Sequence, residues 1–191
     1  SCFVKTFTDD KVEGNKWEYI DSSSEPIELV GEWQVDFVDG DPKLPSSFKT
    51  NELKSWTVLG DSAAQSFAGT GKYTLKFNLP NVHADDWLLN LGTVRESAKV
   101  QINGQKIGTL WSFPFNISIG KYVQKGENIL TIEVTNLSAN RLRDLDKRGV
   151  DWEKFFFVDI FYENFDASNW PIMDSGLLGP VTLNPVSYIN F

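Results

Sequence analysis

Acidic side chains gather between residues 140 and 176, where Asp144, Asp146, Asp151 and Glu153 lie close together in sequence. Carboxyl groups perform general acid and base chemistry, and hydrolysis of a glycosidic bond needs two of them about 5–9 Å apart. An abundance of acids does not show that two of them pair, because acidic residues on loops are usually solvated. This stretch is where we would look for a catalytic acid, and we expect the chain by itself to be non-catalytic.

Two other motifs lack the context that their chemistry requires. The single histidine, His83, lies in a loop expected over residues 81–86, and no nucleophile elbow accompanies it. The string Gly69-Thr70-Gly71-Lys72 superficially resembles a phosphate loop, but it precedes a strand instead of opening a helix. We interpret His83 as a solvated loop residue and the glycine string as a turn before a strand.

Aromatic residues make up 14% of the chain, with 14 Phe and 7 Trp. Small domains bury most aromatic rings, but an excess of rings leaves some for surfaces that bind partners or sugars. A ring exposed as a flat platform, with polar groups around it, is the arrangement that sugar binding needs. Four aromatic residues in expected loops or in the 140–176 stretch are candidates for this role: Trp111, Trp152, Tyr162 and Trp170.

Metal and cofactor sites have little support in the sequence. The single cysteine, Cys2, excludes an internal disulfide framework and a multi-cysteine metal site. Asp39-Gly40-Asp41 and Asp85-Asp86 offer hard oxygen ligands on expected loops, but their spacing is not that of an EF-hand. Solvated turn aspartates are the ordinary interpretation, and a structural calcium ion is the weaker alternative. We expect no other cofactor.

The balance of charge excludes two classes of partner. Lys plus Arg number 18 and Asp plus Glu number 26, so the formal charge is 18 − 26 = −8. This balance repels polyanions, and no run of Lys or Arg forms a basic patch, so neither nucleic acid nor an anionic membrane is an expected partner. No run of about 18 apolar residues exists, so we expect no transmembrane segment. Neutral sugars are electrostatically compatible with the chain.

Alternation of apolar and polar residues dominates the readable segments. In Tyr73–Leu79 the odd positions are apolar and the even ones polar, as a half-buried strand requires. The same alternation runs through Ala98–Ile102 and Leu130–Val134, and Asn103-Gly104 is the strongest two-residue hairpin signal. Many short strands separated by Gly, Pro or Asn predict an all-β fold, an antiparallel β-sandwich or jelly roll. The alternation directs eight side chains into one core: Tyr73, Leu75, Phe77, Val100, Ile102, Leu130, Ile132 and Val134.

Two stretches interrupt the strand pattern. Residues 38–53 are expected to form a surface loop, and residues 140–176 form a long insertion. Within the insertion, Asp151–Tyr162 is either a helix or a buried strand, because periodicity does not distinguish the two. Its density of aromatic rings favours an ordered flap on the rim of the sandwich, with some rings as anchors and others free for a ligand.

The chain is interpreted as one domain over 1–191. Further strands are expected at Glu28–Phe37, Trp87–Leu91, Gln105–Leu110, Asn116–Ile119, Val181–Leu183 and Ser187–Phe191.

The order of motifs between Gly69 and Leu183 resembles the sugar-binding, galactose-binding-domain-like jelly roll of family 2 glycoside hydrolases. The chain more closely resembles the C-terminal β-sandwich of family 106 α-L-rhamnosidases, over roughly residues 28–184, which leaves residues 1–27 as an extension. The residues that carry the family 2 resemblance are Tyr73–Pro80, Leu89–Val94, Ala98–Gly108, Pro114-Phe115, Gly126–Asn128 and Ile132–Val134. Those that extend it to family 106 are Gly31–Val35, Leu53–Thr57, Gly108–Trp111, Thr135–Leu137, Asn140–Leu142 and Ser175–Val181.

The resemblance implies an accessory module, either carbohydrate-binding or structural, of an extracellular or periplasmic glycoside hydrolase that acts on plant or bacterial polysaccharide. Its partners would be carbohydrate, the catalytic barrel of the same parent chain, or both. By resemblance, Asn140, Arg141 and Asp144 would contact sugar beside Trp111, Trp152 and Trp170. A competing interpretation is that Arg141 pairs with a nearby acid. The alternative function is a protein-interaction or adhesion sandwich without sugar affinity.

Overall fold

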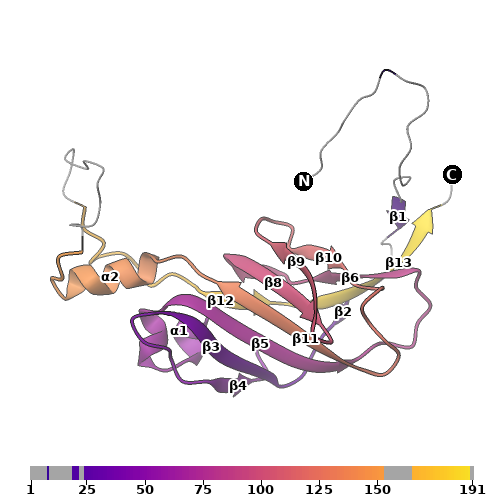
Figure 1. The fold of residues 1–191 in the computed structure, drawn as a ribbon, viewed down its shortest axis with the longest axis horizontal. Helices are drawn as coiled ribbons and strands as arrows, with labels where there is room; N and C mark the ends of the chain where they lie inside the picture. The colour runs from indigo at the N-terminus through magenta and orange to yellow at the C-terminus, as the bar shows by residue number, and fades with distance from the viewer. Residues whose placement is uncertain (1–7, 9–18, 22–23, 153–164, 190–191) are drawn as a thin grey trace.

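The structure is a computed structural model that describes residues 8, 19–21, 24–152 and 165–189. Two antiparallel sheets and a short strand pair enclose one hydrophobic core (Figure 1). The larger sheet has the order β4 (Phe48–Thr50), β3 (Trp33–Asp41), β5 (Ala68–Asn78), β11 (Glu127–Thr135), β8 (Ser97–Ile102) and β9 (Gln105–Leu110). The other sheet has the order β1 (Tyr19–Asp21), β13 (Thr182–Ile189), β6 (Asp86–Asn90) and β10 (Asn116–Ser118), with β2 (Ile27–Glu28) also on β13. The pair is β7 (Thr93–Arg95) with β12 (Gly176–Gly179). The all-β sandwich predicted from alternation is confirmed.

The core register also agrees with the sequence pattern. Leu130 of β11 lies between Leu75 of β5 and Ile102 of β8. Ile132 lies in the same way between Tyr73 and Val100. A shift of one residue would turn this whole set outward. All eight side chains that the alternation directs into the core are buried: Tyr73, Leu75, Phe77, Val100, Ile102, Leu130, Ile132 and Val134.

The hairpin between β8 and β9 forms at Asn103-Gly104, as predicted. Asn103 and Gly104 have φ angles of 51° and 78°, which suit the turn that matches the twist of paired strands. The Asn103 side chain does more than allow the turn. Its amide nitrogen donates to the Asn128 side chain at 2.9 Å, and its oxygen accepts from the Ile129 N–H at 2.9 Å. The hairpin is thereby fastened to the start of β11.

The prediction of a surface loop over residues 38–53 is wrong in two places, because β3 continues to Asp41 and β4 covers Phe48–Thr50. Two glycines allow the extension. Gly40, with a φ of 141°, and Gly69 of β5 pack so closely that a Cβ on either one would lie 2.6 Å from the Cα of the other. Asp39 and Asp41 therefore lie in a paired strand.

Other expected strand limits shift less. The stretch Glu28–Phe37 divides into β2 and β3. The two strands expected near the C-terminus are one continuous strand, β13.

A short helix that alternation does not reveal closes one end of the core. Helix α1 (Trp56–Leu59) is capped by Ser55, whose side chain accepts from the Thr57 N–H, and a 3₁₀ helix (Ser62–Gln65) follows. The Trp56 ring is fully buried and packs edge-on against Phe37 and Phe67, with ring centroids 5.5 and 5.9 Å apart. Such edge-to-face pairs add about 0.5–1.5 kcal/mol each to the burial of the rings.

The 140–176 insertion contains a helix, α2 (Ala139–Lys147), which begins one residue before the predicted stretch. In Figure 1, α2 lies at the end of the molecule opposite β1 and the C-terminus. Most of Asp151–Tyr162, with Glu153 and Tyr162, lies outside the described residues. In the described part of the chain, no helix is both long and apolar enough to cross a membrane.

Candidate functional site

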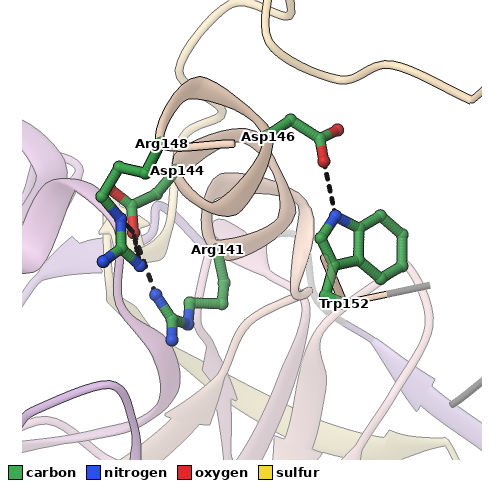
Figure 2. A network of polar contacts seen from close by, with 5 residues as sticks. All are labelled: Arg141, Asp144, Asp146, Arg148 and Trp152. Atoms are coloured by element: carbon green, nitrogen blue, oxygen red, sulfur yellow. Dashed lines mark hydrogen bonds and ion pairs between the residues drawn. The ribbon is translucent and has the colours of Figure 1, made fainter. Parts of the chain in front are cut away.

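Helix α2 carries a network of polar contacts along the rim of the sandwich (Figure 2). The Asp144 carboxylate lies 2.9 Å from Arg141, one turn before it, and 2.9 Å from Arg148, one turn after it. Pairs at these spacings on a helix surface stabilise it by about 0.2–0.5 kcal/mol each. The structure thus contains the ion pair of Arg141 that the competing interpretation describes. Arg141 and Asp144 remain partly exposed beside each other on the rim.

Asp146, on the same helix, joins two parts of the insertion. Its carboxylate accepts a hydrogen bond from the Trp152 indole N–H and a second one from the Ala167 backbone N–H at 2.7 Å. Ala167 is fully buried. The segment after the undescribed residues is therefore fastened to α2, and Trp152 points toward the helix as Figure 2 shows.

Three aromatic rings form a continuous row beside α2. The Trp152 and Phe165 rings are 5.6 Å apart with planes at 88°, and the Phe165 and Trp170 rings are 5.5 Å apart at 77°. The Arg143 side chain donates to the Trp170 carbonyl oxygen at 2.6 Å, which fixes the end of the row. Phe165 and Trp170 are 37% and 39% exposed. We call these three residues the aromatic row.

Trp111 lies apart from the aromatic row, in the loop after β9. It is 73% exposed, and Phe113, two residues further on, is 84% exposed. Leu110 pairs with Ala98 in the β8–β9 ladder, so Trp111 leaves the sheet next to the corner between β7 and β8. Phe113 was not among the sequence candidates, although an aromatic residue directly before Pro114 in a short interstrand loop was a usable signal.

Asn140 is buried, with 2% of its surface exposed, and its amide contacts the protein itself. The side-chain nitrogen donates to the Met173 carbonyl oxygen at 2.8 Å, and the side-chain oxygen accepts from the Met173 N–H at 2.8 Å. Asn136 adds a bond from its nitrogen to the Ser175 hydroxyl at 3.0 Å. These two asparagines position the segment that leads into β12.

That segment forms one wall of a cavity of about 250 Å³. Another wall comes from the corner after β7 and a third from the connection between β11 and α2. Sequence analysis missed this cavity, because its walls come from three segments that are far apart along the chain. Six of its lining residues are Arg95, Glu96, Leu137, Ile172, Met173 and Asp174.

The aspartates considered as calcium ligands hold other contacts. The Asp86 carboxylate accepts hydrogen bonds from the backbone N–H groups of Trp87 and Gly120, both at 2.7 Å, and from the hydroxyl groups of Ser118 and Tyr188. Burial by itself raises the pKa of this carboxyl group, but the four donors outweigh burial and hold the pKa below its ordinary value. Asp85 accepts from the Tyr188 N–H at 2.9 Å. Within the described residues, no three potential metal ligands cluster.

The described residues form an antiparallel β-sandwich, the architecture of jelly-roll modules, with three aromatic rings beside α2 on its rim. Residues 5–162 match the family model described as "Glycosyl hydrolases family 2, sugar binding domain". The chain belongs to this family, which is a non-catalytic module of glycoside hydrolases. The predicted family 2 resemblance is confirmed.

Individual relatives are similar to the chain over most of its length. A protein of Formosa agariphila named "Putative beta-glucuronidase" is 34% identical over 187 residues, which cover 86% of this chain and 16% of that protein. A rhamnosidase from Novosphingobium sp. PP1Y has a TM-score of 0.66 at 29% identity, over 95% of this chain and 16% of its own. A β-glucuronidase from an uncultured Clostridium sp. shows the same fold, with a TM-score of 0.56 at 21% identity over 91% of this chain and 30% of its own. The chain thus spans 16% of the length of both the Formosa and the Novosphingobium relatives.

Proposed function

We propose that this domain contacts carbohydrate at the α2 rim as an accessory module of a larger, α-L-rhamnosidase-like hydrolase of plant or bacterial polysaccharide. The observation that carries the proposal is the aromatic row, in which the Trp170 ring packs against Phe165 and the Trp170 backbone carbonyl accepts from Arg143, while 39% of the residue stays exposed. A ring fixed before binding loses little freedom when a sugar stacks on it. Arg141 and Asp144 offer further hydrogen-bonding groups on the rim, on the side of α2 opposite Asp146 and Trp152 (Figure 2).

Three of the six residues expected to bind sugar enter this proposal in a changed role, and Trp111 is the third, treated below. Asn140 acts as a positioning residue, because its buried amide is occupied by Met173. Trp152 acts as the inner support of the aromatic row, because its indole N–H donates to Asp146. Trp170, Arg141 and Asp144 keep the role of contact residues.

The second partner in the proposal is the catalytic domain of the same parent chain, in an extracellular or periplasmic enzyme. The relatives support this partner, since their chains are several times longer than the matched part. Trp111 and Phe113 support it as well, because two large rings in one loop that are 73% and 84% exposed are typical of a surface that another domain covers. We therefore assign Trp111 to docking in preference to stacking on sugar.

Calorimetric titration of the chain with rhamnose-containing oligosaccharides tests the carbohydrate role. Trp170→Ala is expected to weaken binding by about two- to tenfold, since a stacked ring contributes about 0.5–1.5 kcal/mol beyond its burial. Phe113→Ala is the matched control, an exposed aromatic residue outside the row, and should leave the affinity unchanged. Equal affinity of the Trp170→Ala variant and the unchanged chain would contradict a contact at the rim.

The exposed pair Trp111 and Phe113 also supports a second function. A protein-interaction sandwich without sugar affinity would bind its partner through Trp111 and Phe113, which both lie in the loop between β9 and β10. Absence of any heat of binding across the oligosaccharides, together with loss of contact to the remainder of the parent enzyme in Trp111→Ala, would favour this function over the first.

A further inference from the structure

The 250 Å³ cavity next to β7 carries charged side chains of both signs in its walls. Arg95 and Glu96 lie at the corner between β7 and β8, and Asp174 lies in the segment before β12. In the described part of the chain, these three side chains form no hydrogen bond or ion pair with one another or with any other residue. The charged groups of the neighbouring α2 network differ, because they bind each other (Figure 2). Both signs of charge at the cavity are thus left for a ligand.

Apolar groups form the rest of the wall. Leu137, Ile172 and Met173 line the cavity and are 60%, 40% and 50% exposed, so each presents methyl or methylene surface to the space. Ligand sites combine an apolar lining with a few polar groups in this way. The volume lies below the roughly 300–1,000 Å³ of pockets for drug-sized molecules, so it suits a ligand of the size of one amino acid.

The walls are held in place before a ligand arrives. The Glu96 N–H donates to the Thr135 carbonyl oxygen at 2.9 Å, and Arg95 pairs with Gly176 in the β7–β12 ladder. On the opposite side, Asn140 binds the Met173 backbone through both its donor and its acceptor. Preformed walls reduce the entropy that binding has to overcome.

The separation of the charges selects the class of ligand. Arg95 and the two carboxylates face one cavity without contacting each other, so a molecule between them can meet both signs. A guanidinium binds a carboxylate through two parallel hydrogen bonds, and an ammonium group has three donors for carboxylates. An anion or a cation alone would satisfy only one sign of charge. A zwitterion satisfies both, and a free α-amino acid carries its two charged groups on one carbon atom.

We infer that this cavity is a binding site for one free α-amino acid with an aliphatic side chain. Arg95 binds the α-carboxylate, Glu96 and Asp174 bind the α-ammonium group, and the apolar wall receives the side chain. The inference goes beyond the proposed function and does not rest on it, because no residue of the aromatic row lines the cavity. Asn140 serves this site as a positioning residue, since it holds Met173 in the wall.

An NMR titration of the isotope-labelled chain with L-leucine tests the inference. L-leucine should give saturable shifts at the amides of Glu96, Met173 and Asp174. Three analogues each remove one recognised group. L-leucinamide has no carboxylate and N-acetyl-L-leucine has no ammonium group, so each should bind about tenfold more weakly through loss of a charge-assisted contact. Glycine has no side chain to bury and should bind about fivefold more weakly or less.

A variant assigns the carboxylate contact to one side chain. Arg95→Gln should weaken L-leucine binding by about tenfold and leave L-leucinamide binding unchanged, because the amide has no carboxylate for Arg95 to bind. A merely structural effect of the substitution would weaken both ligands alike. Lys106→Gln is the matched control, since it removes one positive charge from an exposed residue toward the other end of the β8–β9 ladder. It should leave the affinity for L-leucine as it is.

The results decide the inference in four ways. Equal affinity for L-leucine, L-leucinamide and N-acetyl-L-leucine would overturn recognition of a zwitterion. L-leucine shifts that are the same in Arg95→Gln and in the unchanged chain would overturn the role of Arg95. L-rhamnose, titrated in the same way, would assign the cavity to sugar if it shifted the same amides at higher affinity. Absence of saturable shifts with L-leucine overturns the site altogether.

Discussion

Asn140 encloses the backbone of Met173 from both sides, donating to its carbonyl oxygen and accepting from its N–H at 2.8 Å in each bond. The two residues are 33 positions apart, so this side chain fixes where the insertion returns to the sandwich. A side-chain amide imitates a strand partner here, because it offers one donor and one acceptor in the spacing of a peptide group. The insertion therefore ends in a defined place even though α2 lies beyond the sheets.

Asn140→Ala should destabilise the chain by about 1–3 kcal/mol, because it removes the two hydrogen bonds that this buried side chain makes to the Met173 backbone. Urea unfolding monitored by tryptophan fluorescence measures this change. Asn140→Asp keeps the acceptor for the Met173 N–H but places a buried carboxylate against the Met173 carbonyl oxygen, so its loss should be at least as large as that of Asn140→Ala. A stability unchanged by Asn140→Ala, with lower sugar affinity, would instead assign Asn140 a direct contact with the ligand.

Ile132→Ala should lower the free energy of unfolding by about 2–5 kcal/mol, since its fully buried side chain lies between Tyr73 and Val100. Thr131→Ala is the matched control on the same strand. Thr131 faces the other side of the sheet, opposite Thr74, where substitutions usually change stability by about 0.5 kcal/mol or less. Equal losses for the two variants in urea unfolding would show that the inward and outward positions of β11 are assigned wrongly.

The core residues were predictable because the alternation of apolar and polar residues within each strand shows which side chains point inward. Alternation identifies the inward positions of β5, β8 and β11 one strand at a time, and Asn103-Gly104 fixes the hairpin between β8 and β9. β3 beyond Phe37 was missed because its pairing depends on two glycines, Gly40 and Gly69, that lie far apart in sequence and meet only in the folded sheet.

The residues of the α2 rim were less predictable, because they too are positioned by residues far apart in sequence. α2 has only Leu142 and Leu145 as apolar residues in a charged stretch, so it lacks the apolar stripe by which helices are recognised. Trp170 was a correct candidate for an exposed ring, whereas the burial of Asn140 depends on Met173, to which no local pattern connects it. Contacts of this kind are set by tertiary packing and not by the periodicity of one segment.

The isolated domain should hydrolyse neither aryl rhamnosides nor aryl galactosides. Asp144 is shared between Arg141 and Arg148, and Asp146 accepts from the Trp152 indole, so the structure gives both carboxylates partners other than a second catalytic acid. A coupled assay of aryl-group release at high protein concentration measures the activity. Turnover that disappears in Asp144→Asn or Asp146→Asn, but persists in a control substitution of an exposed acid, would overturn this expectation.

Asp86 should make the stability of the domain depend on pH in the acid range. Its folded-state pKa lies below the ordinary value, so the ionised form stabilises the fold at any pH above the unfolded-state pKa of about 3.9. This contribution is lost as the pH falls further, through the folded-state pKa, because the protonated carboxyl group accepts less well from Ser118, Gly120 and Tyr188. Asp86→Ala should also cost about 1–3 kcal/mol at neutral pH by leaving buried donors unpaired.

Free energies of unfolding measured in urea between neutral pH and pH 3 test this expectation. The unchanged chain should lose stability more steeply below about pH 4 than the Asp86→Asn variant, which carries no titrating group at this position. Glu25→Gln is the control, since Glu25 is exposed and its substitution should leave the acid slope as it is. If the free energy of unfolding falls equally steeply with pH in the unchanged chain and in Asp86→Asn, the four donors do not favour the ionised carboxylate. Other groups would then govern acid unfolding.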